Sequence, residues 1–347
     1  MSSPASARMM GILDGLHQGR VDVLAALTYH RVDEPAARQH LDPGLISAQP
    51  ADFAKQMRYL ASRRRVLSLH DLMAVQESGR AIPPRSVMIT FDDAYQDFAQ
   101  HAWPVLRGLG LPVTLFVPTA YPGDPSRSFW WDRLYHALQV TDRSVVVGDE
   151  SFGSLSLRTG GDRANAYALL KRRVKSLPHE SAMDLVEQIT SELSVPSAPG
   201  AVLDWPQLRR LADEGVTLAS HSRTHPLLSR VSALQLREEL EGSMADMERE
   251  VGEAPRAVAY PDGAHSVQVL AAARRAKLSI GFTVVRGVND LHEVDWLRLR
   301  RINVGAHSSL PFIRAQLVTY SGRRAQDGGS RPPVPRPPSS GDDPQQG

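Results

Sequence analysis

The chain of 347 residues lacks cysteine, long apolar runs and an excess of either charge. Without cysteine there can be no disulfide bond, thiolate metal site or cysteine nucleophile, so a metal centre must use histidine, aspartate and glutamate. No apolar run reaches the roughly 18 residues of a membrane span. Asp14, His17 and Arg20 interrupt the segment where a signal peptide would be apolar. We therefore expect a cytoplasmic protein with no transmembrane segment.

The charge balance also narrows the range of partners. Forty basic and 38 acidic residues are interspersed and give a formal net charge of +2. No basic patch suited to nucleic acid stands out, so we expect no nucleic-acid partner. The length fits one large domain or two average ones, and nothing in the sequence indicates the oligomeric state.

Short apolar runs alternate with helical patterns along most of the chain. Such runs, bounded by turn residues, are typical of buried parallel strands. They cover residues 23–29, 87–91, 112–117, 216–219, 257–260, 280–285 and 299–304. Strand and helix in alternation predict a distorted, closed or nearly closed parallel (β/α) barrel of about seven strands.

The pattern changes at residues 121–200, which contain two amphipathic helical patterns, at 166–174 and 183–193. We interpret this stretch as a helical insertion that can act as a lid within a catalytic domain at 23–320. Residues 1–22 form a polar lead-in. Residues 321–347 are rich in Gly, Pro, Ser and Arg, so we predict a disordered tail.

Two adjacent carboxylates, Asp92 and Asp93, end the run at residues 87–91. They repel each other and disfavour strand, so local propensity does not explain them. A bound metal ion would explain the pair, because one carboxylate can coordinate the ion while the other stays free as a base. The alternative is the N-terminus of a helix, where acidic residues are common.

His221 and His225 follow the run at residues 216–219. On one helical turn or in a tight loop, imidazoles four residues apart can reach the same ion, and with Asp93 they make a set of two histidines and one carboxylate. An isolated pair of this kind is equally often a merely polar pair after a strand. Parallel barrels, however, build their sites at the carboxyl ends of strands.

The run at residues 257–260 ends in a Pro-Asp-Gly turn that contains Asp262. Backbone N–H groups in such a turn can donate hydrogen bonds to an oxyanion. Taken alone it is more often an ordinary turn. Three strand ends with suitable chemistry together favour an active site.

Three motifs resemble those of a known family: TFDD at 90–93, HSRTH at 221–225 and AYPDG at 259–263. In this order they are similar to the first three motifs of the polysaccharide deacetylase family, the NodB-type carbohydrate esterases of family four. LTYHRV at 27–32 and LRRINV at 299–304 resemble the branch of poly-N-acetylglucosamine deacetylases and related enzymes of exopolysaccharide biosynthesis. The resemblance covers approximately residues 23–320.

The resemblance implies a metal-dependent hydrolase that removes the N-acetyl group of an amino sugar in a polysaccharide, oligosaccharide or glycan precursor. It makes Asp92 the general base and Asp93, His221 and His225 the ligands of a divalent cation. Zinc is expected, with cobalt, nickel and iron as alternatives. Such an ion lowers the pKa of bound water towards about 7 and polarises the acetamide carbonyl. A backbone amide near Asp262 would help to hold the oxyanion.

Two of the family's features are missing. No late Leu-x-His motif supplies the general acid, and we assign that role to His30, with His307 in reserve. The alternative for His30 is a hydrogen-bonded residue at a strand end. The family often has an arginine before the proline of the third motif, and this chain has Ala259 instead. Arg301 can substitute from a neighbouring strand end, with Asp295 as its partner, although residues of this kind are more often surface charges.

Four aromatic and turn residues complete the expected site. Trp130 and Trp131 can stack on a sugar ring, although paired aromatics more often anchor packing. Tyr260 and Pro261 of the third motif are expected to contact the substrate.

Three rival functions remain. One is removal of formyl or of an O-acyl group from a lipid-linked or nucleotide sugar. The second is a non-catalytic glycan-binding protein on a degenerate deacetylase scaffold. The third is an iron oxygenase with the same type of ligands.

Overall fold

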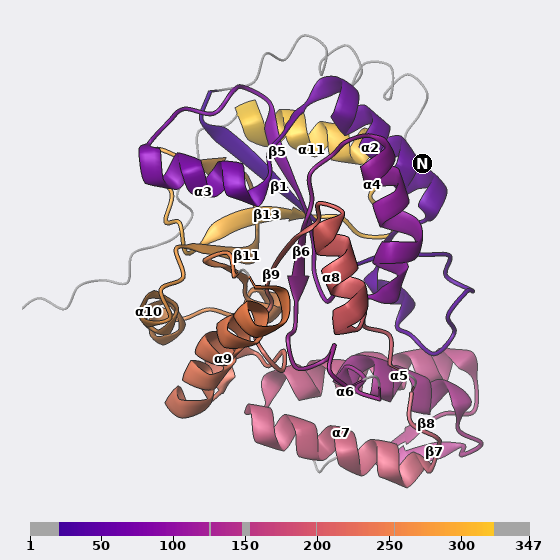
Figure 1. Ribbon diagram of the computed structural model, residues 1–347. Helices are drawn as coiled ribbons and strands as arrows, with labels where there is room; N and C mark the ends of the chain where they lie inside the picture. The colour runs from indigo at the N-terminus through magenta and orange to yellow at the C-terminus, as the bar shows by residue number, and fades with distance from the viewer. Residues whose placement is uncertain (1–20, 125, 148–152, 199, 253, 323–347) are drawn as a thin grey trace, which may run out of the picture.

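The computed structural model describes residues 21–124, 126–147, 153–198, 200–252 and 254–322 (Figure 1). The predicted lead-in and tail lie almost entirely outside these residues. Among the helices described, none combines the length and the apolar character needed to cross a membrane.

Seven parallel strands close a barrel, which confirms the predicted fold. They are β1 (Val23–Tyr29), β5 (Ser86–Phe91), β6 (Thr114–Val117), β9 (Thr217–Ser220), β10 (Ala257–Ala259), β11 (Ile280–Arg286) and β13 (Leu299–Asn303). Their order is β1-β13-β11-β10-β9-β6-β5, and β5 pairs back to β1 from Leu24↔Ser86 to Tyr29↔Phe91. The barrel is distorted, because β9 and β10 share a single pair, Val258↔Ser220.

Alternation along the strands separates two packing surfaces. The inward-facing residues form one buried cluster that includes Ala26, Met88, Phe116, Ala219, Ala259, Phe282 and Leu299. Outward-facing neighbours pack beneath the surrounding helices in two further clusters. The barrel strands are therefore largely buried on both faces, as their apolar sequences predicted, apart from the last three residues of β11.

Helices cover the outside of the barrel. They are α2 (Pro50–Arg63), α3 (Leu69–Ser78), the π-helical η2 (Phe98–Ala102) with α4 (Trp103–Gly108), α8 (Trp205–Asp213), α9 (Ala233–Val251), α10 (Val267–Arg275) and α11 (Leu310–Gly322). Helix α9 begins where the Ser232 side chain accepts a hydrogen bond from the Gln235 N–H, and it ends at Gly252 in the left-handed conformation. Short elements join them: β2 (Arg31–Val32), η1 (Pro43–Leu45), β3 (Ile46–Ala48), β4 (Arg65–Val66), η3 (Leu228–Arg230), η4 (Pro261–Gly263) and β12 (Asn289–Asp290).

The predicted insertion is helical and has its own core. It contains α5 (Trp130–Val140), α6 (Gly160–Ser176), α7 (His179–Leu193) and the hairpin of β7 (Val145–Val147) and β8 (Ser154–Ser156). Its core cluster includes Leu134, Leu138, Leu170, Val186 and Ile189. Figure 1 shows these helices grouped together beyond the arrowhead of β6, at the carboxyl end of that strand.

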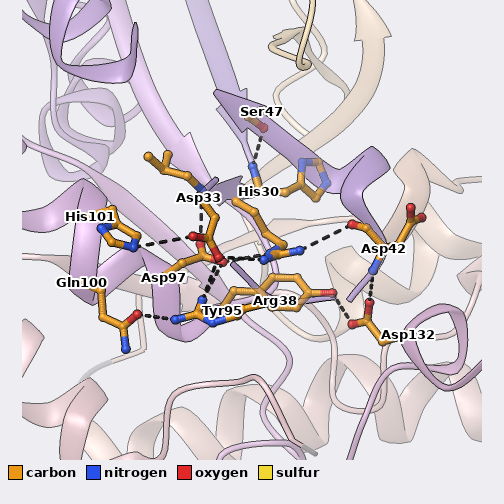
Figure 2. Close-up of polar contacts among 12 residues, drawn as sticks. His30, Asp33, Arg38, Asp42, Ser47, Tyr95, Asp97, Gln100, His101 and Asp132 are labelled. Carbon is orange, nitrogen blue, oxygen red and sulfur yellow. Dashed lines mark hydrogen bonds and ion pairs between the residues drawn. The ribbon is translucent and has the colours of Figure 1, made fainter. Parts of the chain in front are cut away.

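Buried polar contacts connect the insertion to the barrel (Figure 2). The Tyr95 hydroxyl donates to Asp132 of α5 at 2.7 Å, and the Asp42 backbone N–H donates to the other oxygen of Asp132 at 3.0 Å. Beside them Arg31 forms a buried ion pair with Asp97 at 2.8 Å. A buried polar group must be paired to be tolerated, so these contacts specify how α5 packs on the barrel.

Candidate active site

The carboxyl ends of the strands bring the predicted residues to one cavity. In β1, β5 and β9 the inward-facing positions continue past the strand to His30, Asp92 and His221. A cavity of about 300 Å³ is lined by these three side chains together with Asp93 and His225. The alternation that fills the barrel interior thus also directs the reactive groups into its mouth.

Backbone strain is concentrated at this mouth. Among the described residues, nine other than glycine have positive φ. Five of them lie in the turns after β5, β9 and β10: Asp93 (71°), Ala94 (52°), Ser222 (62°), His225 (61°) and Asp262 (53°). Asp93 and Ala94 therefore form a left-handed turn, and the acidic pair does not start a helix. Such conformations cost roughly 1–3 kcal/mol each and persist where the surroundings enforce them.

Asp93, His221 and His225 form a compact group of possible ligands, and their donor atoms all lie within 4.8 Å of one another. Nε2 of His225 is 3.2 Å, and Nε2 of His221 3.5 Å, from Oδ1 of Asp93. That oxygen is buried and accepts no hydrogen bond from the described residues. Burial alone would raise the pKa of Asp93, but the two histidines outweigh it and hold the pKa well below its usual range. Two imidazoles and one ionised carboxylate fit a divalent cation such as zinc.

A backbone carbonyl determines the tautomer of His221. Nδ1 of His221 lies 2.7 Å from the carbonyl oxygen of Ala259. Because a carbonyl can only accept, Nδ1 carries a proton, which leaves Nε2, on the side of Asp93, as the nitrogen that can bind a cation. The third motif therefore supports the second through its main chain, at the position where the family often has arginine.

Asp92 is held by Arg301 from across the barrel interior. Nη1 and Nη2 of Arg301 each lie 2.8 Å from one oxygen of Asp92, and Nε donates to the carbonyl oxygen of Thr283. Burial alone would raise the pKa of Asp92, but Arg301 and then His221 outweigh it and lower the pKa below its ordinary value. Asp92 is therefore ionised, as a general base must be.

The predicted partner of Arg301 was wrong. Asp295 lies 2.8 Å from Nε of Arg298 instead. Arg301 follows the inward-facing Leu299 by two residues, so its side chain enters the barrel and contacts Asp92. Its strand is not next to β5 either, because β1 lies between them.

The histidine candidates for the general acid differ in position. His30 lines the cavity, and its backbone N–H donates to the Ser47 hydroxyl at 2.9 Å (Figure 2). His307 is exposed in the loop before α11 and is not among the cavity-lining residues. The geometry leaves His30 as the candidate, and its role stays a prediction.

The third motif contributes only part of what was expected. Asp262 lines the cavity, where Nζ of Lys175 lies 2.8 Å from its carboxylate. Tyr260 is fully buried and does not line the cavity, so its expected contact with substrate has no support from this geometry and stays a prediction. Alternation turns it outward, next to Val258, into the cluster beneath α9 and α10. Pro261 is buried in the turn and is likewise not a lining residue.

The tryptophan pair lies at the cavity, and Trp131 also anchors packing. Trp130 and Trp131 line the cavity. Trp131 is also stacked on Phe129 with ring centroids 4.4 Å apart, and it meets the His225 ring edge-on at 4.9 Å. Its indole N–H donates to the Tyr95 hydroxyl at 2.9 Å. Trp131 therefore anchors the insertion beside the ligand group, while contact with a sugar stays a prediction for both.

Three polar residues that the insertion adds to the cavity were not among the predicted site residues. Lys171, Lys175 and His179 line it opposite the barrel residues. Lys171 and Lys175 lie one turn apart on α6, on the side that also presents the buried Val174. The sequence pattern that could have indicated them is the position of two lysines on the apolar side of an amphipathic helix.

Comparison with known proteins agrees with this geometry. A family model described as polysaccharide deacetylase matches residues 79–281. The chain is 27% identical over 130 residues to poly-beta-1,6-N-acetyl-D-glucosamine N-deacetylase of Escherichia coli (strain K12). That alignment covers 35% of this chain and only 18% of the relative.

Solved structures resemble the chain over most of its length. The Streptococcus pyogenes deacetylase PplD in complex with acetate has a TM-score of 0.58 at 18% identity, covering 85% of this chain and 98% of that one. IcaB from Ammonifex degensii has a TM-score of 0.56 at 17% identity, covering 86% and 97%. At these identities the similarity establishes the fold alone.

Proposed function

Because the chain belongs to the polysaccharide deacetylase family, we propose that it is a metal-dependent N-deacetylase. Its substrate would be an N-acetylated amino sugar of a polysaccharide, oligosaccharide or glycan precursor, as in exopolysaccharide biosynthesis. The products are acetate and a free amine. The name of the Escherichia coli relative supports a poly-N-acetylglucosamine-like substrate.

One observation carries the proposal: an ionised, buried carboxylate stands beside a separate group of ligands. Asp92 is clamped by both terminal nitrogens of Arg301, and one of its oxygens is 3.9 Å from Nε2 of His221. A glycan-binding protein on the same scaffold would not require a second, ionised carboxylate at this position. An iron oxygenase would not require it either.

These contacts support the following roles for the residues. Asp93, His221 and His225 would hold the divalent cation, with zinc expected. When bound, the cation acts as a Lewis acid on the acyl oxygen and makes water more acidic. Asp92 accepts the proton of the attacking water, and Arg301 keeps its carboxylate oriented and ionised. His30 then protonates the departing nitrogen, so the C–N bond breaks with a neutral amine as leaving group.

The turn after β10 completes the chemistry. A backbone N–H near Asp262 would donate to the oxyanion of the tetrahedral intermediate. The left-handed conformation of Asp262 shapes that turn. Trp130 and Trp131 would contact the sugar within the cavity, with their ring faces against its C–H groups.

The proposal is tested by metal content and product analysis together. We expect about one divalent ion per purified chain by mass spectrometry, and its loss in His221→Ala. Asp92→Asn should keep the metal, because Asp93, His221 and His225 stay in place, and should lower kcat by roughly 10²–10⁴-fold through loss of the general base. Released acetate and amine are measured on N-acetylglucosamine oligomers.

Matched N-formyl and O-acetyl sugars identify the rival hydrolases. If the enzyme turns over N-formyl or O-acetyl sugars faster than N-acetyl sugars, it is a deformylase or an O-deacylase instead of an N-deacetylase. Absence of any bound divalent ion, or full turnover by Asp92→Asn, would refute the mechanism.

A further inference from the structure

The loop that carries both histidines is held by a carboxylate from another element. Glu239 lies in α9 and is only 3% exposed. One of its oxygens accepts the backbone N–H groups of Arg223 and Thr224, each at 2.8 Å. The other oxygen contacts the Thr224 hydroxyl. Two buried N–H groups and a hydroxyl thus share one acceptor side chain, and a buried donor left without an acceptor is costly, so this contact is a strong constraint on the loop.

The loop needs such a constraint because its backbone is strained. Ser222 and His225 both have φ near +60°. The N–H of Ser222 donates to the Ser220 hydroxyl at 3.1 Å, and that of His225 to the Ser222 hydroxyl at 3.2 Å. The two N–H groups between them are those that Glu239 binds. Glu239 therefore accounts for half of the amide hydrogen bonds of the segment from Ser222 to His225.

Glu239 belongs to a polar stripe on the buried side of α9. Ser243, one turn later, lies 2.7 Å from the Ser220 hydroxyl. Asp246 accepts hydrogen bonds from the Thr119 hydroxyl at 2.8 Å and from Nε of Arg223 at 3.0 Å. Spacings of four and three residues place all three on one face of the helix. This face thus binds the loops after β6 and β9 by polar contacts.

We propose that Glu239 is a positioning residue that orders the His221–His225 loop for metal binding. Ordering of this loop aims the imidazoles of both histidines at Asp93 before the cation arrives. Without the carboxylate, two buried amides lose their acceptor and the loop must give up its strained backbone to find others. The cost appears as weaker metal binding. This inference rests on the proposed metal site, so its test measures metal affinity directly.

The test compares three variants of the full chain by titration calorimetry with zinc. Glu239→Ala should weaken zinc binding by about 10–100-fold, as loss of groups that orient metal ligands does. Glu239→Gln should recover most of the affinity, because its amide oxygen can still accept both backbone N–H groups. Glu241→Ala, half-exposed on the same helix, is the matched control and should bind as the wild type does.

Each other outcome counts against the idea. Wild-type affinity in a folded Glu239→Ala variant would overturn it, and so would a Gln variant as weak as the Ala variant. If Glu239→Ala does not fold, Glu239→Asp serves instead, since it keeps the charge but is one methylene short. We expect it to bind zinc more weakly, and unchanged affinity would overturn the inference. A wild-type chain that binds no metal would instead refute the proposed function itself.

Discussion

The barrel and the insertion each contribute one basic side chain, Arg301 and Lys175, that lies 2.8 Å from an aspartate at the same cavity. Inside the barrel, Arg301 and Asp92 have side chains 0% and 3% exposed, and both terminal nitrogens of the guanidinium take part. Across the insertion boundary, Lys175 and Asp262 are 38% and 46% exposed and share one contact. The two pairs have the same length but differ in their environment.

That difference decides what each pair can do. A solvated pair gains little, because water already satisfies both charges, and it contributes about 0–1 kcal/mol. In a buried pair each charge needs the other, so removing one partner costs roughly 3–5 kcal/mol. We infer that the barrel pair maintains the charge state of the base, while the insertion pair only guides how α6 lies over the cavity.

Breaking the barrel pair should have the largest effect. Arg301→Gln would leave Asp92 buried and uncompensated, so we expect a loss of about 3–5 kcal/mol in the free energy of unfolding and a higher pKa of Asp92. Urea denaturation measures the loss of stability. The higher pKa of Asp92 should move the acidic limb of the pH–rate profile to higher pH. Arg298→Gln, in the exposed pair with Asp295, is the control and should change stability by less than about 1 kcal/mol. Equal losses in both variants would contradict the comparison.

A third aspartate extends the comparison, because Asp132 is buried in the insertion and forms no ion pair with any arginine or lysine of the described residues. Burial raises its pKa from 3.8 to about 7, despite hydrogen bonds from Tyr95 and the Asp42 N–H and the more distant charge of Arg31. Between these two values the folded chain holds a proton that the unfolded chain has released. The contribution of Asp132 to stability must therefore decrease as pH rises from about 4 to 7, by at most about 4 kcal/mol.

Asp132→Asn should remove that dependence. The free energy of unfolding, measured in urea at several pH values, should decrease less steeply across this range in the variant. The difference between the two curves isolates the one carboxyl group from all other titrating groups. Parallel curves would show that Asp132 titrates normally and that this junction tolerates its charge.

Breaking the insertion pair should have the smallest effect. Lys175→Ala removes a half-exposed contact, so we expect a change in unfolding free energy of less than about 1 kcal/mol, weaker still at high salt. Zinc affinity should stay the same, since Lys175 contacts none of the proposed ligands. A loss as large as that of Arg301→Gln would place the insertion pair in the same class as the barrel pair.

Much of the fold could be predicted because its signals are local. Buried parallel strands are short apolar runs, and all seven were found at or within two residues of their bounds. The reactive side chains follow these runs directly, so strand ends located Asp92, Asp93, His221 and His225. Even the outward direction of Tyr260 was implied by its position next to Ala259, although the sequence analysis overlooked it.

The barrel, its inward and outward positions and the strand-end residues at its mouth could therefore be predicted from the sequence. Which groups meet there depends on how distant segments pack together. Arg301 reaches Asp92 over a separation of 209 residues, and Glu239 reaches the histidine loop from the following helix. The reason is physical: periodicity along the chain reports which face of an element is buried, but strand order and register determine what that face contacts.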